Sequence, residues 1–261
     1  MSTRIVAIAN QKGGVGKTTT AISLGATLAA YEKHVLLVDL DPQSNCSSGL
    51  GFQFDGTEPT SYELVIGDAV VGAASRATEF PHLSLVPATP HLAGAEVELV
   101  GMVGREFRLR DALSREQIAA YDFVLVDCPP SLGLLTLNAR AAAHGLLVPI
   151  QCEYFAMEGV SMLMEPVDEV RRYLNPGLTI DGILLTMYDE RTNLARQVAS
   201  EVRGVFGDLV FETLVPRNIR LAEAPSFGRP IHAYDLRSSG SRAYLRLGRE
   251  YLDRRERSHV G

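Results

Sequence analysis

The fold of this chain is decided by the stretch Ile5-Val6-Ala7-Ile8-Ala9-Asn10-Gln11-Lys12-Gly13-Gly14-Val15-Gly16-Lys17-Thr18-Thr19-Thr20. Its apolar, β-branched start predicts a short strand, and residues 21–30, which follow its end, favour a helix. The glycines between them let successive backbone N–H groups point into one concavity, to which the helix adds the positive end of its dipole. The order of strand, glycine loop and helix therefore predicts a cradle for a polyphosphate.

Similar short apolar runs recur along the chain and alternate with longer segments of helical periodicity. The runs cover residues 35–39, 83–87, 123–127, 146–150, 183–187 and 210–215. Near-continuous apolar strands fit burial on both faces, so the alternation predicts a parallel sheet covered by crossover helices. The predicted fold class is α/β: residues 1–261 form a single domain with a mostly parallel, twisted sheet flanked by helices. Residues 240–257 are expected to form a terminal helix packed on the core.

Composition narrows the classes of function. Hydrophobic residues make up 46% of the chain, enough for a substantial core, but no apolar run approaches the roughly 18–20 residues that cross a bilayer. The first residues show no export signal, so the sequence predicts a cytoplasmic protein. A net charge of -6 argues against a surface that is basic throughout and leaves nucleic-acid binding to a local patch. Three cysteines without C-x-x-C spacing, Cys46, Cys128 and Cys152, are expected to be reduced thiols.

The ending Gly16-Lys17-Thr18 assigns roles within the glycine loop. Lys17 is expected to reach the β- and γ-phosphates, the Thr18 hydroxyl to coordinate Mg²⁺, and Thr19 to support the α-phosphate. The standard pattern G-x-x-x-x-G-K-[ST] has glycine where this chain has Gln11, so the match departs from it at one position. The predicted nucleotide-binding set is Lys12, Gly13, Gly14, Val15, Gly16, Lys17, Thr18 and Thr19.

The segment Lys12-Gly-Gly-Val-Gly-Lys17-Thr-Thr matches the deviant Walker A motif, and the chain thereby resembles the ParA/MinD group of ATPases. Further stretches resemble the chromosome-partitioning ParA/Soj family, so that the resemblance covers nearly the whole chain; they lie at residues 92–99, 129–136, 151–155 and 220–226. The family implies ATP and Mg²⁺ as cofactors and a slow, partner-stimulated ATP hydrolysis. It also implies that Lys12 of one subunit contacts the phosphates bound by the other, so that ATP promotes a homodimer.

One predicted strand ends in Asp39-Leu40-Asp41, where the alternation of side chains places both carboxylates on one side of the chain. By the resemblance, Asp41 orients the attacking water and completes a catalytic set with Lys12 and Lys17. Asp39 would support the Mg²⁺ shell or the loop lysine. The alternative is that these aspartates form a turn before Pro42.

A second predicted strand ends in Asp127, which has the form of a Walker B carboxylate. Mg²⁺ keeps several waters and is typically reached by one carboxylate, so Asp127 is expected to bind it through such a water. Residues 129–133 would then be a switch-like loop that senses the γ-phosphate.

The resemblance assigns further residues to the base and to DNA. In Soj-like proteins a Pro-Arg-Asn stretch after a late strand borders the adenine, and Pro216 and Asn218 match it here. The positions matching DNA-contacting arginines are Arg191 and Arg220. Doubled by the symmetry of a dimer, they would give modest, strongly salt-dependent affinity for DNA of any sequence. The alternative for each arginine is an ordinary surface charge.

The resulting prediction is an ATPase whose ATP-bound dimer holds nucleoid DNA and drives chromosome or plasmid segregation with a ParB-type partner. The resemblance also suggests the replication initiator as a target. One alternative is a MinD-like ATPase that acts on a membrane surface, against which stands the charged end Arg254-Arg255-Glu256-Arg257, which lacks an apolar face. Another is an ATP-dependent synthetase on the same fold, which needs a substrate-sized pocket beside the γ-phosphate.

Overall fold

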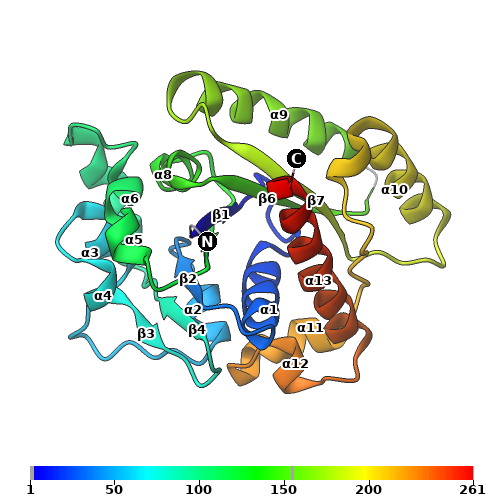
Figure 1. Ribbon diagram of the computed structural model, residues 1–261, viewed down its shortest axis with the longest axis horizontal. Coiled ribbons are helices and arrows are strands. Elements are labelled where there is room, and N and C mark those ends of the chain that lie inside the picture. The colour runs from blue at the N-terminus through cyan, green and yellow to red at the C-terminus, as the bar shows by residue number, and fades with distance from the viewer. Residues whose placement is uncertain (1–2, 154–155, 261) are drawn as a thin grey trace.

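A computed structural model describes residues 3–153 and 156–260, with the backbone alone for 156–164 and 258–260. Within this part the chain forms a seven-stranded sheet of order β3-β4-β2-β5-β1-β6-β7 (Figure 1). Every neighbouring pair is parallel except β3 and β4. The predicted α/β fold with a mostly parallel sheet is confirmed. The strands are β1 Arg4–Ile8, β2 Val35–Asp39, β3 Arg76–Ala77, β4 Leu83–Val86, β5 Phe123–Asp127, β6 Gly145–Gln151 and β7 Thr179–Thr186.

Helices cover both faces of the sheet. Successive residues of β1 and β2 enter opposite cores: Val6 and Leu37 on one face, Ala7 and Leu36 on the other. The first face is covered by α1 Lys17–Ala30, α2 Asn45–Gly49, α11 Ile219–Glu223, α12 Ile231–Tyr234 and α13 Ser239–Val260. The second is covered by α3 Ser61–Ile66, α4 Val71–Ala74, α5 Leu92–Glu98, α6 Arg108–Ala112, α7 Arg115–Ile118, α8 Leu134–Ala142, α9 Ala156–Tyr173 and α10 Asn193–Phe206. The strands are therefore buried on both sides, as their apolar runs predict.

The prediction of a strand at residues 210–215 is wrong, because this segment does not pair continuously with the sheet. This segment makes two isolated bridges beside β7, Ile183 with Val210 and Tyr188 with Pro216. Between the bridges, the backbone N–H groups of Glu212 and Thr213 donate to the Glu250 carboxylate of α13, at 2.8 and 3.0 Å. A side chain from a distant helix thus takes donors that a regular strand would use in pairing.

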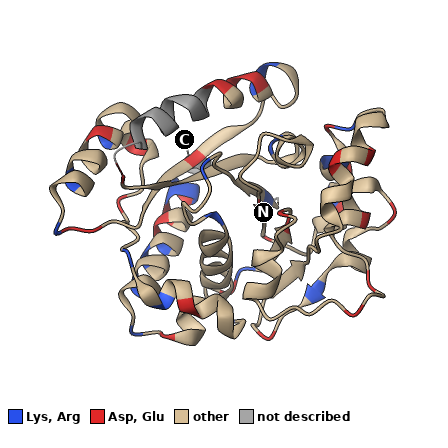
Figure 2. Ribbon diagram, turned by 180° about the vertical axis from the view of Figure 1, so that it is seen from behind, with Lys and Arg blue, Asp and Glu red and all other residues tan. Residues whose placement is uncertain are grey.

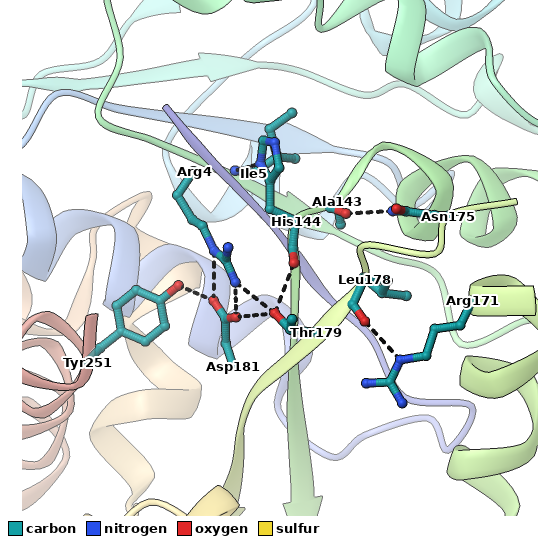
Figure 3. A network of polar contacts seen from close by, with 10 residues as sticks. All are labelled: Arg4, Ile5, Ala143, His144, Arg171, Asn175, Leu178, Thr179, Asp181 and Tyr251. Atoms are coloured by element: carbon teal, nitrogen blue, oxygen red, sulfur yellow. Dashed lines mark hydrogen bonds and ion pairs between the residues drawn. The ribbon is translucent and has the colours of Figure 1, made fainter. Parts of the chain in front are cut away.

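The predicted terminal helix is α13, which packs beside α1 (Figure 1). The Tyr244 hydroxyl of α13 lies 3.0 Å from the Thr20 hydroxyl of α1, and both residues are buried. Two turns farther along the helix, the Tyr251 hydroxyl donates to Asp181 of β7 at 2.5 Å (Figure 3). Asp181 also forms an ion pair with Arg4 of β1, and its side chain is only 5% exposed. This network ties the last helix to the amino ends of β1 and β7.

A groove of about 1230 Å³ borders this network. It is lined by Arg4, Thr179, Asp181 and the charged half of α13, and so lies at the amino edge of the sheet. The sequence-predicted site instead lies at the carboxyl ends of the strands, where open α/β sheets bind their ligands. We therefore do not assign this groove to the nucleotide.

Candidate nucleotide-binding site

The glycine loop is held open by contacts from outside it. The Asn10 amide nitrogen donates to the Pro149 carbonyl at 2.7 Å, and the Asn10 amide oxygen accepts from the Lys12 N–H at 3.0 Å. Gly14 and Gly16 have φ of +75° and +91°, a left-handed conformation that favours glycine. A Cβ placed on Gly14 would meet no described atom within 4 Å. The loop therefore has open space beside Gly14 immediately before α1, where the sequence predicts the phosphate cradle.

Lys17, the first residue of α1, folds back over this loop. Its ammonium donates to the Lys12 carbonyl at 3.2 Å, and the residue is only 6% exposed. Burial lowers the pKa of Lys17, while the carboxylate of Asp127 acts in the opposite direction. A buried ammonium beside an open glycine loop is a preorganised partner for phosphate oxygens.

Asp127, at the end of β5, is a buried carboxylate whose side chain is inaccessible to solvent. Neither of its oxygens accepts a hydrogen bond of standard geometry from the described residues, although the Thr18 hydroxyl is a nearby donor. Burial raises the pKa of Asp127 well above its usual range, and Asp39 raises it further; the Thr18 hydroxyl and Lys17 lower it. An unsatisfied buried carboxylate next to a threonine hydroxyl fits the oxygen ligands that Mg²⁺ requires, because a cation there would offset the cost of burial.

Asp39 lies beside Asp127 in the register of β2 and β5 but has partners of its own. One oxygen accepts from the N–H and the hydroxyl of Ser47, at 2.8 and 2.6 Å, and the other accepts from the Asp41 N–H at 3.2 Å. Burial raises the pKa of Asp39 to about 6. Asp39 therefore holds the start of α2 against the sheet, which leaves Asp127 as the better metal candidate.

Asp41 is 7% exposed and accepts from the Gln43 N–H at 2.9 Å through one oxygen. The strand ends at Asp39, and the turn that follows begins at Asp41, whose carbonyl accepts from the Ser44 N–H at 2.8 Å. Asp41 is close enough to Lys17 to raise the pKa of that ammonium. Its position at the carboxyl edge of the sheet, near the loop lysine, is what a residue that orients a water would need.

Lys12 has a partner that sequence reasoning missed. Its ammonium lies 3.4 Å from a carboxylate oxygen of Glu153, and the two side chains are 42% and 45% exposed. Glu153 also lies 3.8 Å from Arg217. It belongs to the 151–155 stretch that resembles the family, of which Tyr154 and Phe155 lie outside the described residues. Lys12 therefore lies at the protein surface in an ion pair with Glu153.

The predicted adenine residues follow the segment beside β7. Pro216 bridges to Tyr188, and Asn218 caps α11 by accepting from the Arg220 N–H at 2.8 Å. The amide nitrogen of Asn218 donates to the Ser239 hydroxyl at 2.6 Å. Its amide is therefore already engaged, and backbone groups of this segment are better placed to meet a base.

The predicted DNA-contacting arginines are exposed but paired with acids. Arg191, 84% exposed, lies 2.7 Å from Asp189 and holds the pKa of that carboxyl at about 2. Arg220, 54% exposed, lies 2.8 Å from Glu223 and 3.5 Å from Asp235. To bind a DNA phosphate, each arginine would have to give up its ion pair with an acidic residue of its own chain.

Strand, uncovered glycine loop, buried lysine and orphan carboxylate together define a phosphate-loop nucleotide-binding protein. Residues 3–180 match a family model described as AAA domain. The chain is 57% identical to the chromosome partitioning protein ParA of Myxococcus xanthus over 96% of its own length and 88% of the relative's. It is 52% identical to the sporulation initiation inhibitor protein Soj of Bacillus subtilis, over 95% of this chain and 97% of that one. The chain belongs to the ParA/Soj family of chromosome-partitioning ATPases.

Solved structures share the fold. Cobyrinic acid a,c-diamide synthase from Mycobacterium smegmatis, with a bound ATP analogue and magnesium, superposes with a TM-score of 0.81 at 39% identity, covering 95% of this chain and 93% of that one. The septum site-determining protein MinD from Pyrococcus horikoshii, complexed with Mg-ADP, gives a TM-score of 0.73 at 26% identity, with 95% of each chain covered. Two relatives of this fold are thus known with an adenine nucleotide and magnesium bound.

Proposed function

We propose that this ATPase dimerises around ATP, binds DNA without sequence preference as a dimer, and releases it on hydrolysis. The observation that carries the proposal is Lys12, an exposed lysine at the mouth of the nucleotide loop in a chain of the ParA/Soj family. A ParB-type partner that accelerates hydrolysis would make the cycle directional and place the protein on the nucleoid. The replication initiator is a further candidate target.

The site residues divide the chemistry among them. The glycine loop and Lys17 bind the β- and γ-phosphates, and Thr19 supports the α-phosphate. Thr18 and Asp127 hold Mg²⁺, which neutralises phosphate charge when it is bound. Asp41 orients the attacking water, and Lys12 leaves Glu153 to neutralise charge on the nucleotide of the partner subunit.

DNA binding depends on a few arginines in an acidic protein. Figure 2 shows acidic and basic residues interspersed along the elements, and the chain carries a net charge of -6. Arg191 and Arg220 of two subunits would supply a small number of phosphate contacts, each made at the expense of an internal ion pair. The affinity is therefore modest, falls steeply with salt, and depends on the dimer.

The synthetase alternative is supported by the cobyrinic acid a,c-diamide synthase structure at 39% identity. We favour partitioning because identity to ParA of Myxococcus xanthus is 57% over nearly the whole chain. A synthetase predicts ATP turnover stimulated by a metabolite, whereas a partitioning ATPase predicts stimulation by DNA together with a ParB-type protein. For the MinD-like alternative, no helix in the described part of the chain is long and apolar enough to span a bilayer, and vesicle co-sedimentation with ATP tests surface binding.

The test compares sedimentation and DNA binding, with ATP, of the wild type and three single variants. Lys12→Ala should remain monomeric and off DNA, because it lacks the charge that crosses between subunits. Asp41→Ala should accumulate as a DNA-bound dimer, because ATP binds but is not hydrolysed. Lys33→Ala removes a lysine outside the site and should behave as wild type. If Lys12→Ala and Asp41→Ala behave alike, the assigned roles are wrong.

A further inference from the structure

One family-like stretch, residues 92–99, has no part in the site described so far. It forms α5 and the turn that follows, and its buried residues Leu92, Ala95 and Leu99 fix the helix in the core beneath the sheet. Two glutamates of the same helix, Glu96 and Glu98, point to different partners. Glu98 contacts Tyr62 of α3, whereas Glu96 contacts the start of α8, the helix that follows Asp127.

Glu96 caps a helix that is remote in sequence. One of its carboxylate oxygens accepts from the Leu134 N–H at 2.8 Å and the other from the Leu135 N–H at 3.2 Å. These are the first two residues of α8, whose N-cap residue, Gly133, has no side chain to provide a cap. No acidic residue lies in the first turn of α8 either. Glu96 thus supplies both the missing acceptors and the negative charge that a helix N-terminus favours.

The glycine at position 133 permits this approach. A Cβ on Gly133 would lie 2.3 Å from one Glu96 oxygen and 2.8 Å from the other, closer than the atoms can come. Its φ of -69° and ψ of -179° are open to any residue, so a side chain at this position would have to displace the Glu96 carboxylate from the start of α8. The carboxylate and the missing side chain form one fitted contact between α5 and α8.

The contact fixes the far end of the loop that follows Asp127. At its near end, Asp127 is held in register with Ile8 of β1 and Asp39 of β2. At its far end, α8 is anchored to α5 by Glu96 and to α6 by Asn138, which accepts from the Leu109 N–H at 3.0 Å. Figure 1 shows α5 and α6 beside one another, next to α8. Residues 128–133 therefore connect two anchored positions, Asp127 in the sheet and the start of α8.

We propose that Glu96 is a positioning residue for ATP hydrolysis: by tying α8 to α5 it sets the path of residues 128–133 beside the Asp127 carboxylate. The inference rests on the proposed binding of Mg²⁺ by Asp127. Loss of the tie should slow turnover, because small displacements of groups around a reacting centre are costly. It should leave nucleotide binding largely intact, because the glycine loop belongs to β1 and α1.

The primary test compares Glu96→Ala with Glu98→Ala in steady-state ATP hydrolysis. Glu98 lies on the same helix and accepts from the Tyr62 hydroxyl at 2.6 Å, so its removal also breaks one α5 contact. We expect kcat of Glu96→Ala to fall roughly tenfold. Its KM for Mg-ATP, and both constants of Glu98→Ala, should stay within about twofold of wild type. Equal kcat for the two variants would overturn the inference.

A second variant separates positioning from helix capping. In Glu96→Ala/Gly133→Ser the serine has room and supplies a local cap to α8 without rebuilding the tie to α5. All variants are assayed well below the lowest melting temperature of the set, so unfolding does not contribute. Slow turnover that persists in the double variant supports positioning; turnover that recovers shows that Glu96 is only a cap and overturns the inference.

Asp127→Asn is included to keep the two proposals apart. If it retains Mg²⁺-dependent turnover, the metal assignment of the proposed function fails, whatever Glu96 does. If it loses turnover while Glu96→Ala matches Glu98→Ala, the proposed function stands and this inference fails.

Discussion

Replacing Asp127 with asparagine should make the nucleotide-free protein more stable and at the same time insensitive to Mg-ATP. The Asp127 carboxylate is buried, accepts no hydrogen bond of standard geometry in the described part of the chain, and lies beside Asp39 on the neighbouring strand. Two buried carboxylates repel each other and have lost their hydration, so the fold holds them at a cost. Asparagine keeps the shape and removes one charge.

The raised pKa of Asp39 indicates how much free energy it costs to bury a carboxylate at this position. Burial, with a contribution from Asp41, raises the pKa of Asp39 from 3.8 to about 6, which corresponds to on the order of 3 kcal/mol. Because the pKa of Asp39 is higher in the folded state, the folded protein takes up a proton as pH falls through about 6. The free energy of unfolding therefore increases as pH falls from about 6 to about 4. We expect Asp127→Asn to gain about 1–3 kcal/mol at about pH 7.5 and less at about pH 5, where the pair already carries a proton.

Urea denaturation at the two pH values, with and without a non-hydrolysable ATP analogue and Mg²⁺, measures both effects. Wild type should gain about 2.7 kcal/mol at a nucleotide concentration a hundred times Kd, and the variant much less. Asp68→Asn, the same change at an exposed position, should leave both quantities unchanged. A nucleotide-free Asp127→Asn that is less stable than wild type, or one that gains as much from Mg-ATP, would refute the reasoning.

Three further perturbations test separate parts of the structure. Glu153→Gln should release Lys12 and strengthen ATP-dependent dimerisation by up to about thirtyfold, since two exposed ion pairs, each contributing roughly 0–1 kcal/mol, are broken per dimer; an unchanged dimerisation constant in sedimentation equilibrium would show that the pair does not restrain Lys12. Asp181→Ala should cost about 3–5 kcal/mol in urea denaturation, because it leaves Arg4 unpaired in a largely buried network, and a loss below about 1 kcal/mol would contradict that view. Arg191→Ala should lower the slope of log affinity for DNA against log salt by about 1.8 per dimer without changing the melting temperature; an unchanged slope would remove Arg191 from the interface.

Sequence reasoning recovered what neighbouring residues determine. The order of strand, glycine loop and helix located the nucleotide loop, and apolar runs located every strand that ends at the site. Parallel pairing then brought Asp39 and Asp127 together, as expected of carboxylates at the ends of adjacent strands.

What it missed depends on contacts between residues far apart in the chain. The pairing of Glu153 with Lys12 and of Glu96 with α8 is visible only once the chain is folded. The same holds for residues 210–215, where two N–H groups donate to Glu250 of α13. The sequence leaves Asp39 three possible roles: supporting the Mg²⁺ shell, supporting the loop lysine, or forming a turn. Only the folded structure shows that it accepts hydrogen bonds from Ser47.

The central claim is that ATP is held between two subunits, each lending Lys12 to the nucleotide of the other. A crystal structure of the full chain with a non-hydrolysable ATP analogue and Mg²⁺ measures this directly. We expect a two-fold dimer in which the Lys12 ammonium has left Glu153 and contacts the phosphates bound by the partner subunit. A nucleotide-loaded single subunit, with Lys12 still on Glu153 or directed into solvent, would contradict it.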